Sequence, residues 1–380
     1  MSENRQGVLF PSDAYPASTA VGHQGDIVYL DRVARSVLNP PESTGMPYWS
    51  LNPYVGCAFG CAYCYARYAH RYAQEREDAR RAPGHPAAAP VSEEMPAWLA
   101  FERRIYVKRH AAEQLRTELA RAQRSESGGR PTRRTRLLRG ETLVIGTATD
   151  PYQPAERHFR VTRRILEALA EYSGLRIVLI TKSALVTRDI DVLTRIASRS
   201  RCTVHLSLIT LDRELARRIE PRAPTPDARL RALTRLREGG VDVGINVMPV
   251  LPGITDRPAA LAALIARVSA AGATHVNAGP LRLQAEARRR YLPFIEAEFP
   301  GLAERYRTTY ALSDDVSERY RAGLSRVVQT FCERAGIRYS QFEGDRRGSP
   351  SLRPSPSAAP SLVVQTELGL VGAGFSPPSS

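Results

Sequence analysis

The chain has 380 residues, of which 43% are hydrophobic and 24% charged, a composition typical of a globular protein with a substantial core. No apolar run approaches the ~20 residues that a membrane-spanning helix needs, and the N-terminus lacks the pattern of a secretory signal. We therefore expect no membrane contact and a cytoplasmic location. The formal net charge is +15, from 54 Lys and Arg against 39 Asp and Glu.

Composition divides the chain into three parts. Residues 1–45 are polar with little periodicity, and we expect a loosely ordered lead-in with one short strand at 26–30. The core is expected over 46–342, with a basic insertion near 124–140. From 343 to 380 the chain is rich in Gly, Ser and Pro, which cannot bury enough apolar surface to order, so we predict a disordered tail.

The most informative stretch is LNPYVGCAFGCAYCYAR at 51–67, which follows a predicted strand at the start of the core. Its cysteines Cys57, Cys61 and Cys64 have the spacing C-x3-C-x2-C, and Gly56 and Gly60 let the backbone wrap closely. Converging thiolates are typical ligands of a soft metal centre. Three ligands rather than four would leave one metal position open to an outside molecule.

A basic stretch follows at 101–140, with 12 basic and 4 acidic residues. Three interpretations stay open: a nucleic-acid footprint, an arginine-rich solvated surface, and a docking face for an acidic electron donor. The chain has only two lysines, Lys108 and Lys182, which indicates a general bias towards arginine. Within the stretch we expect a strand at 104–108, a helix at 111–124 and an exposed insertion at 125–139.

The remaining core alternates between apolar strands and amphipathic helices. Predicted strands cover 142–146, 176–181, 204–209, 241–250 and 275–281. Predicted helices cover 64–77, 159–172, 189–199, 212–219, 226–239, 258–271 and 286–299, with a last one at 314–335. With the strand before the cysteines, this makes about six βα units, fewer than the eight of a closed barrel. We predict an α/β fold, a partial (β/α)6 TIM-like barrel.

Several motifs together resemble one known family. The cysteine spacing, with Tyr63 before the last cysteine, resembles the signature of the radical S-adenosylmethionine superfamily. The segments TATDPYQPAE (147–156), TKSALVTRDIDVL (181–193), EPRAPTPDARLRAL (220–233) and VMPVLPGITD (247–256) are similar to its spore photoproduct lyase-like, or DNA repair photolyase-like, branch. The resemblance covers roughly residues 48–283.

The resemblance implies two cofactors and a reaction. Cys57, Cys61 and Cys64 would hold three irons of a [4Fe-4S] cluster, and the fourth iron would chelate S-adenosylmethionine. Reductive cleavage would give a 5′-deoxyadenosyl radical for hydrogen abstraction from substrate, with electrons from a flavodoxin- or ferredoxin-like donor. The partial barrel agrees with this family's fold.

Other candidate site residues follow the strands, where sites of parallel α/β proteins gather. Thr149 and Asp150 stand where the family usually has a glycine-rich segment. Lys182 and Ser207 end the next two strands and are candidates for the carboxylate or ribose of the cofactor.

Two tyrosines flank the last cysteine of the motif. The resemblance implies that Tyr63 packs near the adenine of the cofactor. Tyr65 is the candidate catalytic residue, as a relay for a hydrogen atom, and ordinary packing under the loop is its alternative role.

The departures from the family define the alternatives. Spore photoproduct lyases use a further cysteine about forty residues beyond the triad, and this chain has none between Cys64 and Cys202. We therefore expect a related enzyme, acting on nucleic acid, on a peptide or on a small metabolite, with Cys202 and Cys332 as buried inert thiols. A non-catalytic iron–sulfur protein, or a zinc site completed by His70, remains as an alternative.

Overall fold

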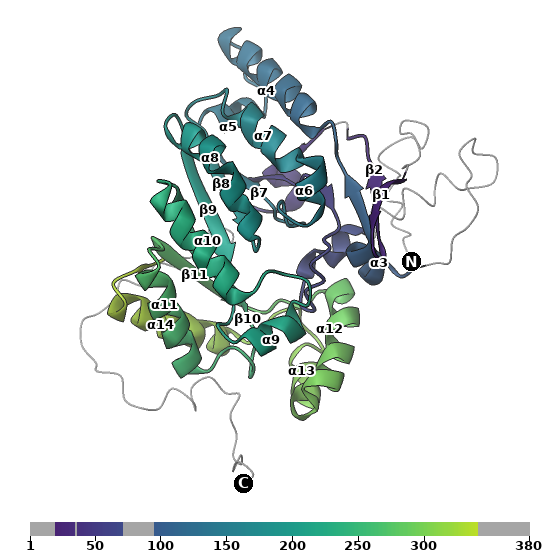
Figure 1. The fold of residues 1–380 in the computed structure, drawn as a ribbon, viewed down its shortest axis with the longest axis vertical. Helices are drawn as coiled ribbons and strands as arrows, with labels where there is room; N and C mark the ends of the chain where they lie inside the picture. The colour runs from purple at the N-terminus through teal and green to yellow at the C-terminus, as the bar shows by residue number, and fades with distance from the viewer. Residues whose placement is uncertain (1–19, 35, 71–94, 341–380) are drawn as a thin grey trace, which may run out of the picture.

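The computed structural model of the chain describes residues 20–34, 36–70 and 95–340 (Figure 1). Its centre is a sheet of eight strands in the order β12–β11–β10–β9–β8–β7–β4–β3. The strands are β3 (Leu38–Asn39), β4 (Trp49–Leu51), β7 (Thr142–Ile145), β8 (Arg176–Thr181), β9 (Arg201–Ser207), β10 (Asp242–Val250), β11 (His275–Pro280) and β12 (Arg338–Tyr339). All pairs from β4 to β12 are parallel, and β3 adds an antiparallel edge. The predicted partial (β/α)6 barrel is confirmed.

The two faces of this sheet differ because successive strand residues point to opposite sides. One row across β9, β10 and β11 consists of Leu206, Ile245 and Val276, all buried and apolar. The apolar face of the sheet packs against helices, among them α8 (Ile190–Ala197), α10 (Pro226–Glu238) and α14 (Glu318–Arg334). The opposite, inner face carries the polar residues described below.

A second, smaller sheet was not predicted from the sequence. It has the order β1–β2–β6–β5, with β1 (Ala20–Gln24), β2 (Ile27–Asp31), β6 (Arg104–Val107) and β5 (Tyr54–Val55). The prediction of one short strand before residue 45 was therefore incomplete, since β1, β2, β3 and helix α1 (Pro41–Thr44) all lie there. β2 pairs in parallel with β6 across more than seventy residues, a contact that local periodicity cannot show.

The helices follow the prediction with local differences. Helix α4 (Ala111–Ser127) is longer than expected, and the insertion after it contains α5 (Thr135–Leu138), in which Thr135 and Leu137 are buried. The insertion is therefore not wholly exposed. The predicted helix at 159–172 divides into α6 (Ala155–Phe159) and α7 (Val161–Leu169), because Arg160 between them has a φ of +49°.

The remaining elements surround the cysteine motif or follow the core strands. The 3-10 helix η2 (Tyr65–Arg67) begins the predicted helix at 64–77, whose residues beyond 70 lie outside the described part. Helix α3 (Ala97–Arg103) was not predicted, and it contacts η2 and α12 (Ala285–Glu298). The other elements are η3 (Ala184–Asp189), α9 (Arg213–Ile219), α11 (Pro258–Ala270), η4 (Pro300–Leu302) and α13 (Ala303–Thr309).

The structure describes neither end of the chain. The predicted tail at 343–380 and residues 1–19 of the lead-in lie outside the described residues. Among the residues that are described, no helix is both long enough and apolar enough to cross a bilayer.

Candidate cofactor site

The cysteine loop, residues 56–64, owes its shape to two glycines. Gly56 and Gly60 have φ values of +90° and +67°, a region that residues with a side chain rarely adopt. A Cβ at Gly60 would lie 2.6 Å from Nη2 of Arg222, and one at Gly56 would lie 2.9 Å from the carbonyl oxygen of Phe101. Both positions therefore require glycine for the loop to wrap as tightly as it does.

The three cysteines of this loop are free thiols. Cys57 and Cys61 are 8% and 7% exposed, and Cys64 is half-buried. Burial raises the pKa of Cys57 to about 12 and also raises those of Cys61 and Cys64. The nearby Cys57 and Cys64 thiolates raise the pKa of Cys61 further. Only a bound cation would make three thiolates stable side by side here.

This donor set fits a metal cluster. A single zinc ion needs its ligands at ~2.0–2.3 Å from one point. Within the described part of the chain, no three His, Cys, Asp or Glu side chains converge in that way. In an iron–sulfur cluster each thiolate binds its own iron, so the sulfurs can stand further apart.

His70, which would be the fourth ligand in the zinc alternative, packs against two aromatic rings. Its ring is 5.4 Å from the Tyr106 ring and 6.3 Å from the Phe101 ring, measured between centroids. The side chain is fully buried, and neither ring nitrogen has a hydrogen-bond partner among the described residues. Burial lowers the pKa of His70 to about 3.

His70 should make the protein less stable in acid. The unfolded chain binds a proton at His70 below pH ~6.5 and the folded chain does not until pH ~3, so stability falls as pH decreases through this window. At pH 5 the cost is about 2 kcal/mol, from ~1.5 pH units at ~1.36 kcal/mol each. We expect His70→Phe to remove this part of the difference in unfolding free energy between pH 7.5 and pH 5, measured by urea denaturation. His158→Gln, at an exposed position of α6, is the control, and an unchanged pH dependence in His70→Phe would contradict the prediction.

A buried carboxylate connects the cysteine loop to strand β8. Glu220 accepts hydrogen bonds from the Tyr63 hydroxyl and from Nη2 of Arg229, and its Oε1 lies 3.7 Å from Nζ of Lys182. The Lys182 ammonium in turn lies 5.5 Å from the centroid of the Tyr63 ring. The predicted residues Tyr63 and Lys182 are therefore brought together, and the residue that joins them was missed from the sequence.

Thr149 and Asp150 lie at the expected strand end, but other protein groups already engage their side chains. The Thr149 hydroxyl donates to the carbonyl oxygen of Gly56 at 2.6 Å. Asp150 accepts from the Thr181 hydroxyl at 2.6 Å and from the Lys182 backbone N–H at 2.7 Å. Both residues thus fix the loop after β7 to its neighbours.

Ser207 ends β9 and belongs to a polar row on the inner face of the sheet. Its neighbours in register are Asn246 on β10 and Asn277 on β11, and all three are buried. Asn277 Nδ2 donates to Asn246 Oδ1 at 2.8 Å. The two asparagines were missed, although each is a polar residue within an apolar strand, which is a readable signal.

Tyr65 follows Cys64 directly and begins η2 at the edge of the cysteine loop. It keeps 41% of its surface exposed, while its hydroxyl donates to the carbonyl oxygen of Thr147. The ring stacks on Tyr68 with centroids 6.5 Å apart. Desolvation by the surrounding protein raises the pKa of Tyr65 well above its usual value, so the phenol stays protonated at neutral pH.

Both lysines of the chain lie at this end of the molecule. Lys108, just after β6, donates from Nζ to the carbonyl oxygen of Asn52 at 2.7 Å. The side chain of Asn52 donates to the Thr147 hydroxyl at 3.1 Å. Lys182 follows β8 directly, so the two ammonium groups support neighbouring parts of the same site.

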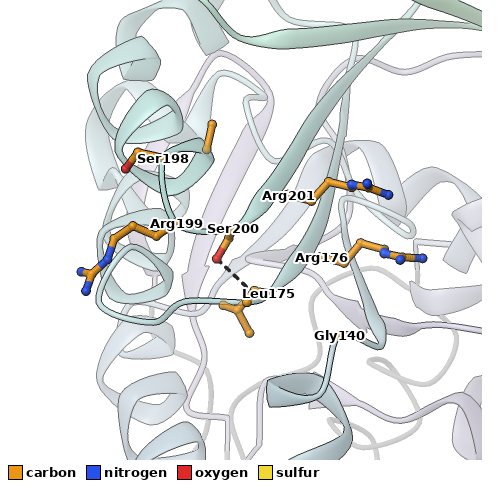
Figure 2. Close-up of a pocket in the computed structure, with 9 residues that line it drawn as sticks. Gly140, Leu175, Arg176, Ser198, Arg199, Ser200 and Arg201 are labelled. Carbon is orange, nitrogen blue, oxygen red and sulfur yellow. Dashed lines mark hydrogen bonds between the residues drawn. The ribbon is translucent and has the colours of Figure 1, made fainter.

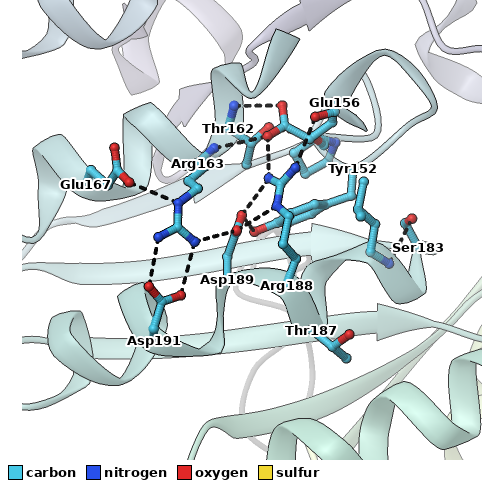
Figure 3. A network of polar contacts seen from close by, with 12 residues as sticks. Tyr152, Glu156, Thr162, Arg163, Glu167, Ser183, Thr187, Arg188, Asp189 and Asp191 are labelled. Atoms are coloured by element: carbon cyan, nitrogen blue, oxygen red, sulfur yellow. Dashed lines mark hydrogen bonds and ion pairs between the residues drawn. The ribbon is translucent and has the colours of Figure 1, made fainter. Parts of the chain in front are cut away.

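A polar network holds the loops after β7 and β8 together (Figure 3). Arg188 lies between two buried carboxylates, 2.7 Å from Glu156 and 2.8 Å from Asp189. The Tyr152 hydroxyl donates to Asp189 at 2.9 Å. Because η3 carries Arg188 and Asp189 while Tyr152 and Glu156 follow β7, the network fixes both strand ends beneath the candidate site.

A pocket of about 380 Å³ lies at the other end of the sheet (Figure 2). Arg176 and Arg201, the first residues of β8 and β9, are paired in register and extend side by side there. The residues Ala197 and Ser198 at the C-terminal end of α8 line the same pocket. Because Arg176 and Arg201 begin their strands, this pocket lies at the amino ends of β8 and β9. Active sites of such folds lie at the opposite, carboxyl ends of the strands, where the cysteine loop is.

Comparisons with known proteins bear on the family of the chain and on its fold. The model of the radical SAM superfamily matches residues 100–265, which begin after the cysteine loop. An uncharacterized protein of Mycobacterium tuberculosis is 32% identical over 326 residues, covering 85% of this chain and 84% of the relative. The radical SAM Nalpha-GlyT isomerase of Pseudomonas phage M6 is 23% identical, covering 78% of this chain and 54% of that protein.

Solved structures show the same architecture. Spore photoproduct lyase complexed with dinucleoside spore photoproduct has a TM-score of 0.54 at 15% identity, covering 82% of this chain and 81% of that one. A mutant of that lyase with bound AdoMet gives a TM-score of 0.54 at 13% identity. Because the fold, the order of motifs and the family model agree, the chain belongs to the radical S-adenosylmethionine superfamily, with the fold of its spore photoproduct lyase-like branch.

Proposed function

We propose that this protein is an enzyme that holds a [4Fe-4S] cluster on Cys57, Cys61 and Cys64 and binds S-adenosylmethionine at the iron without a cysteine. The observation that carries the proposal is the set of three free thiols, two buried and one half-buried, in one glycine-shaped loop at the end of an open parallel sheet. When bound, the reduced cluster and S-adenosylmethionine supply a 5′-deoxyadenosyl radical, which abstracts a hydrogen atom from substrate. An oxygen-labile cluster of this kind suits the reducing cytoplasm, which we propose as the location.

The residues of the chain would bind and orient the cofactor. Lys182 is the proposed partner of the methionine carboxylate, since Glu220 holds its ammonium beside the cysteine loop. The row Ser207, Asn246 and Asn277 offers hydroxyl and amide groups for the ribose and base. Tyr63 contributes the flat face of its ring next to Lys182.

Thr149 and Asp150 act in this proposal by positioning other groups. Thr149 holds the backbone before Cys57, and Asp150 holds the backbone at Lys182. Tyr65 is the proposed relay for a hydrogen atom, because it stands next to Cys64, is partly exposed and keeps its phenol protonated.

The substrate class is a further proposal, and we propose nucleic acid. The net charge of +15 supports it, because an excess of cationic side chains attracts the phosphate backbone. The alternative is a peptide or a small metabolite. It is favoured by the ion pairs of the basic stretch, in which carboxylates within 4.0 Å neutralise six arginines: Arg103, Arg109, Arg116, Arg134, Arg136 and Arg139.

One anaerobic assay tests the reaction. The reconstituted protein, mixed with dithionite and S-adenosylmethionine, should form 5′-deoxyadenosine and methionine, measured by liquid chromatography with mass spectrometry. The control omits dithionite. If the protein binds a cluster and forms no 5′-deoxyadenosine, it is a non-catalytic iron–sulfur protein.

The same assay with an added oligonucleotide tests the substrate class. A nucleic-acid substrate should raise the rate of 5′-deoxyadenosine formation, and binding of the oligonucleotide should weaken steeply as salt increases. Binding that does not depend on salt, with no change in rate, would favour the peptide or metabolite alternative.

A further inference from the structure

The back of the cysteine loop is covered by one carboxylate and three arginines, which we call the backing face. Glu102, on α3, is nearly buried and forms ion pairs with Arg67 of η2, with Arg222 at 2.9 Å and with Arg290 of α12 at 3.6 Å. Three guanidinium groups around one carboxylate leave an excess of two positive charges. The excess lies where α3, η2 and α12 contact one another.

This face touches the cysteine loop directly. Arg222 donates from Nε to the carbonyl oxygen of Ala58, and its backbone N–H donates to Phe59 at 3.2 Å. Gly60 approaches so closely that a Cβ there would meet both Arg222 and Glu102 within 3 Å. The Arg222 side chain is nevertheless 35% exposed, so a single layer of side chains separates the loop from solvent here.

The other basic region of the molecule is less suited to bind an acidic partner near the cysteines. Six arginines of the 101–140 stretch are paired with carboxylates. Of these six only Arg103 lies on α3, and Figure 1 shows α4, which carries Arg116, at the top of the view and α3 at its right side. The backing face is closer to the thiols and has more arginines than carboxylates. This contrast favours the backing face over the 101–140 stretch as the docking site for an acidic electron donor.

We propose that the backing face, through Arg222 and Arg290, is the docking surface for an acidic redox protein of the flavodoxin or ferredoxin class. The proposal rests on the proposed cluster. One electron passes from the reduced donor, which is thereby oxidised by one electron, to the oxidised cluster, whose charge changes from 2+ to 1+. Complementary charge mainly accelerates the encounter and fixes its orientation, so the complex should weaken as salt increases.

The test replaces Arg290 with glutamine and measures two quantities for the reconstituted protein. The first is the affinity for an acidic bacterial flavodoxin, and for a ferredoxin in a parallel series, by calorimetry at low salt. The second is 5′-deoxyadenosine formation driven by the reduced flavodoxin or by dithionite. Arg289→Gln is the matched control, because Arg289 is the next residue on α12 and pairs with Glu286 at 3.4 Å.

We expect Arg290→Gln to bind the flavodoxin about fivefold more weakly, the effect of losing ~1 kcal/mol from one exposed charge pair. The flavodoxin-driven rate should fall by a similar factor and the dithionite-driven rate should stay unchanged. Equal affinities of wild type, Arg289→Gln and Arg290→Gln, or affinity that does not respond to salt, would overturn the docking surface. If the wild type forms no 5′-deoxyadenosine with dithionite, the proposed reaction is overturned instead. The affinity measurements would then still show whether the flavodoxin binds at the backing face.

Discussion

Single replacement of Cys57, Cys61 or Cys64 by alanine is expected to abolish assembly of a [4Fe-4S] cluster. In the proposed cluster each thiolate would bind its own iron, so each replacement would leave one iron without its protein ligand. Reconstitution under anaerobic conditions should give wild-type protein with four irons per chain, read by iron analysis, the visible charge-transfer band and electron paramagnetic resonance. The three variants should lack that band.

Two other cysteines serve as matched controls. Cys202, near the start of β9, and Cys332, on α14, are both buried and lie apart from the loop. Cys202→Ala and Cys332→Ala should assemble the cluster as the wild type does. A full cluster spectrum in any one of the three loop variants would show that the loop is not the metal site, and the proposed reaction would fall with it.

Replacing Glu220 with glutamine should lower the free energy of unfolding by about 3–5 kcal/mol, the usual effect of removing one partner from a buried ion pair. The variant leaves Arg229, which is buried, without its counter-charge, and it releases Lys182 from the same carboxylate. Glutamine can still accept the hydrogen bond from Tyr63, so the loss reports mainly on charge. Urea denaturation of the protein without cofactors measures it.

A double variant and a surface control sharpen this test. Glu220→Gln combined with Arg229→Met removes both charges and should recover part of the lost stability, because no buried charge then lacks its partner. Asp227→Asn breaks the surface ion pair with Arg213 and should change stability little. If Glu220→Gln is as stable as Asp227→Asn, Glu220 does not stabilise the site through its charge.

The sequence was sufficient for the core of the fold because its signals are local. Each buried strand of the parallel sheet is a short apolar run, and each is followed by an amphipathic helix, so β7 to β11 were placed within a few residues. The cysteine spacing likewise identifies its own loop. Strand β9 was the least accurate, since Arg201 at its start resembles the end of the preceding helix.

Contacts between distant segments could not be read in this way. The sheet formed by β1, β2, β6 and β5 joins parts of the chain far apart in sequence, and its strands are short. Glu220 follows α9 and Arg229 lies within α10, and in the sequence both appear as ordinary charged residues. Only the fold shows that both are buried and form an ion pair beside the cysteine loop. The segment that begins with EPR at 220–222 resembles a family motif, but the sequence does not indicate the ion pairs that Glu220 and Arg222 form.

The two lysines have a practical consequence for chemical labelling. Amine-acylating reagents can modify only Lys108, Lys182 and the N-terminal amine of this chain, because its other basic side chains are arginines and histidines. Since both lysines border the candidate site, peptide mapping of the acylated protein reads the occupancy of that site from Lys108 and Lys182, with the N-terminal amine as the internal reference.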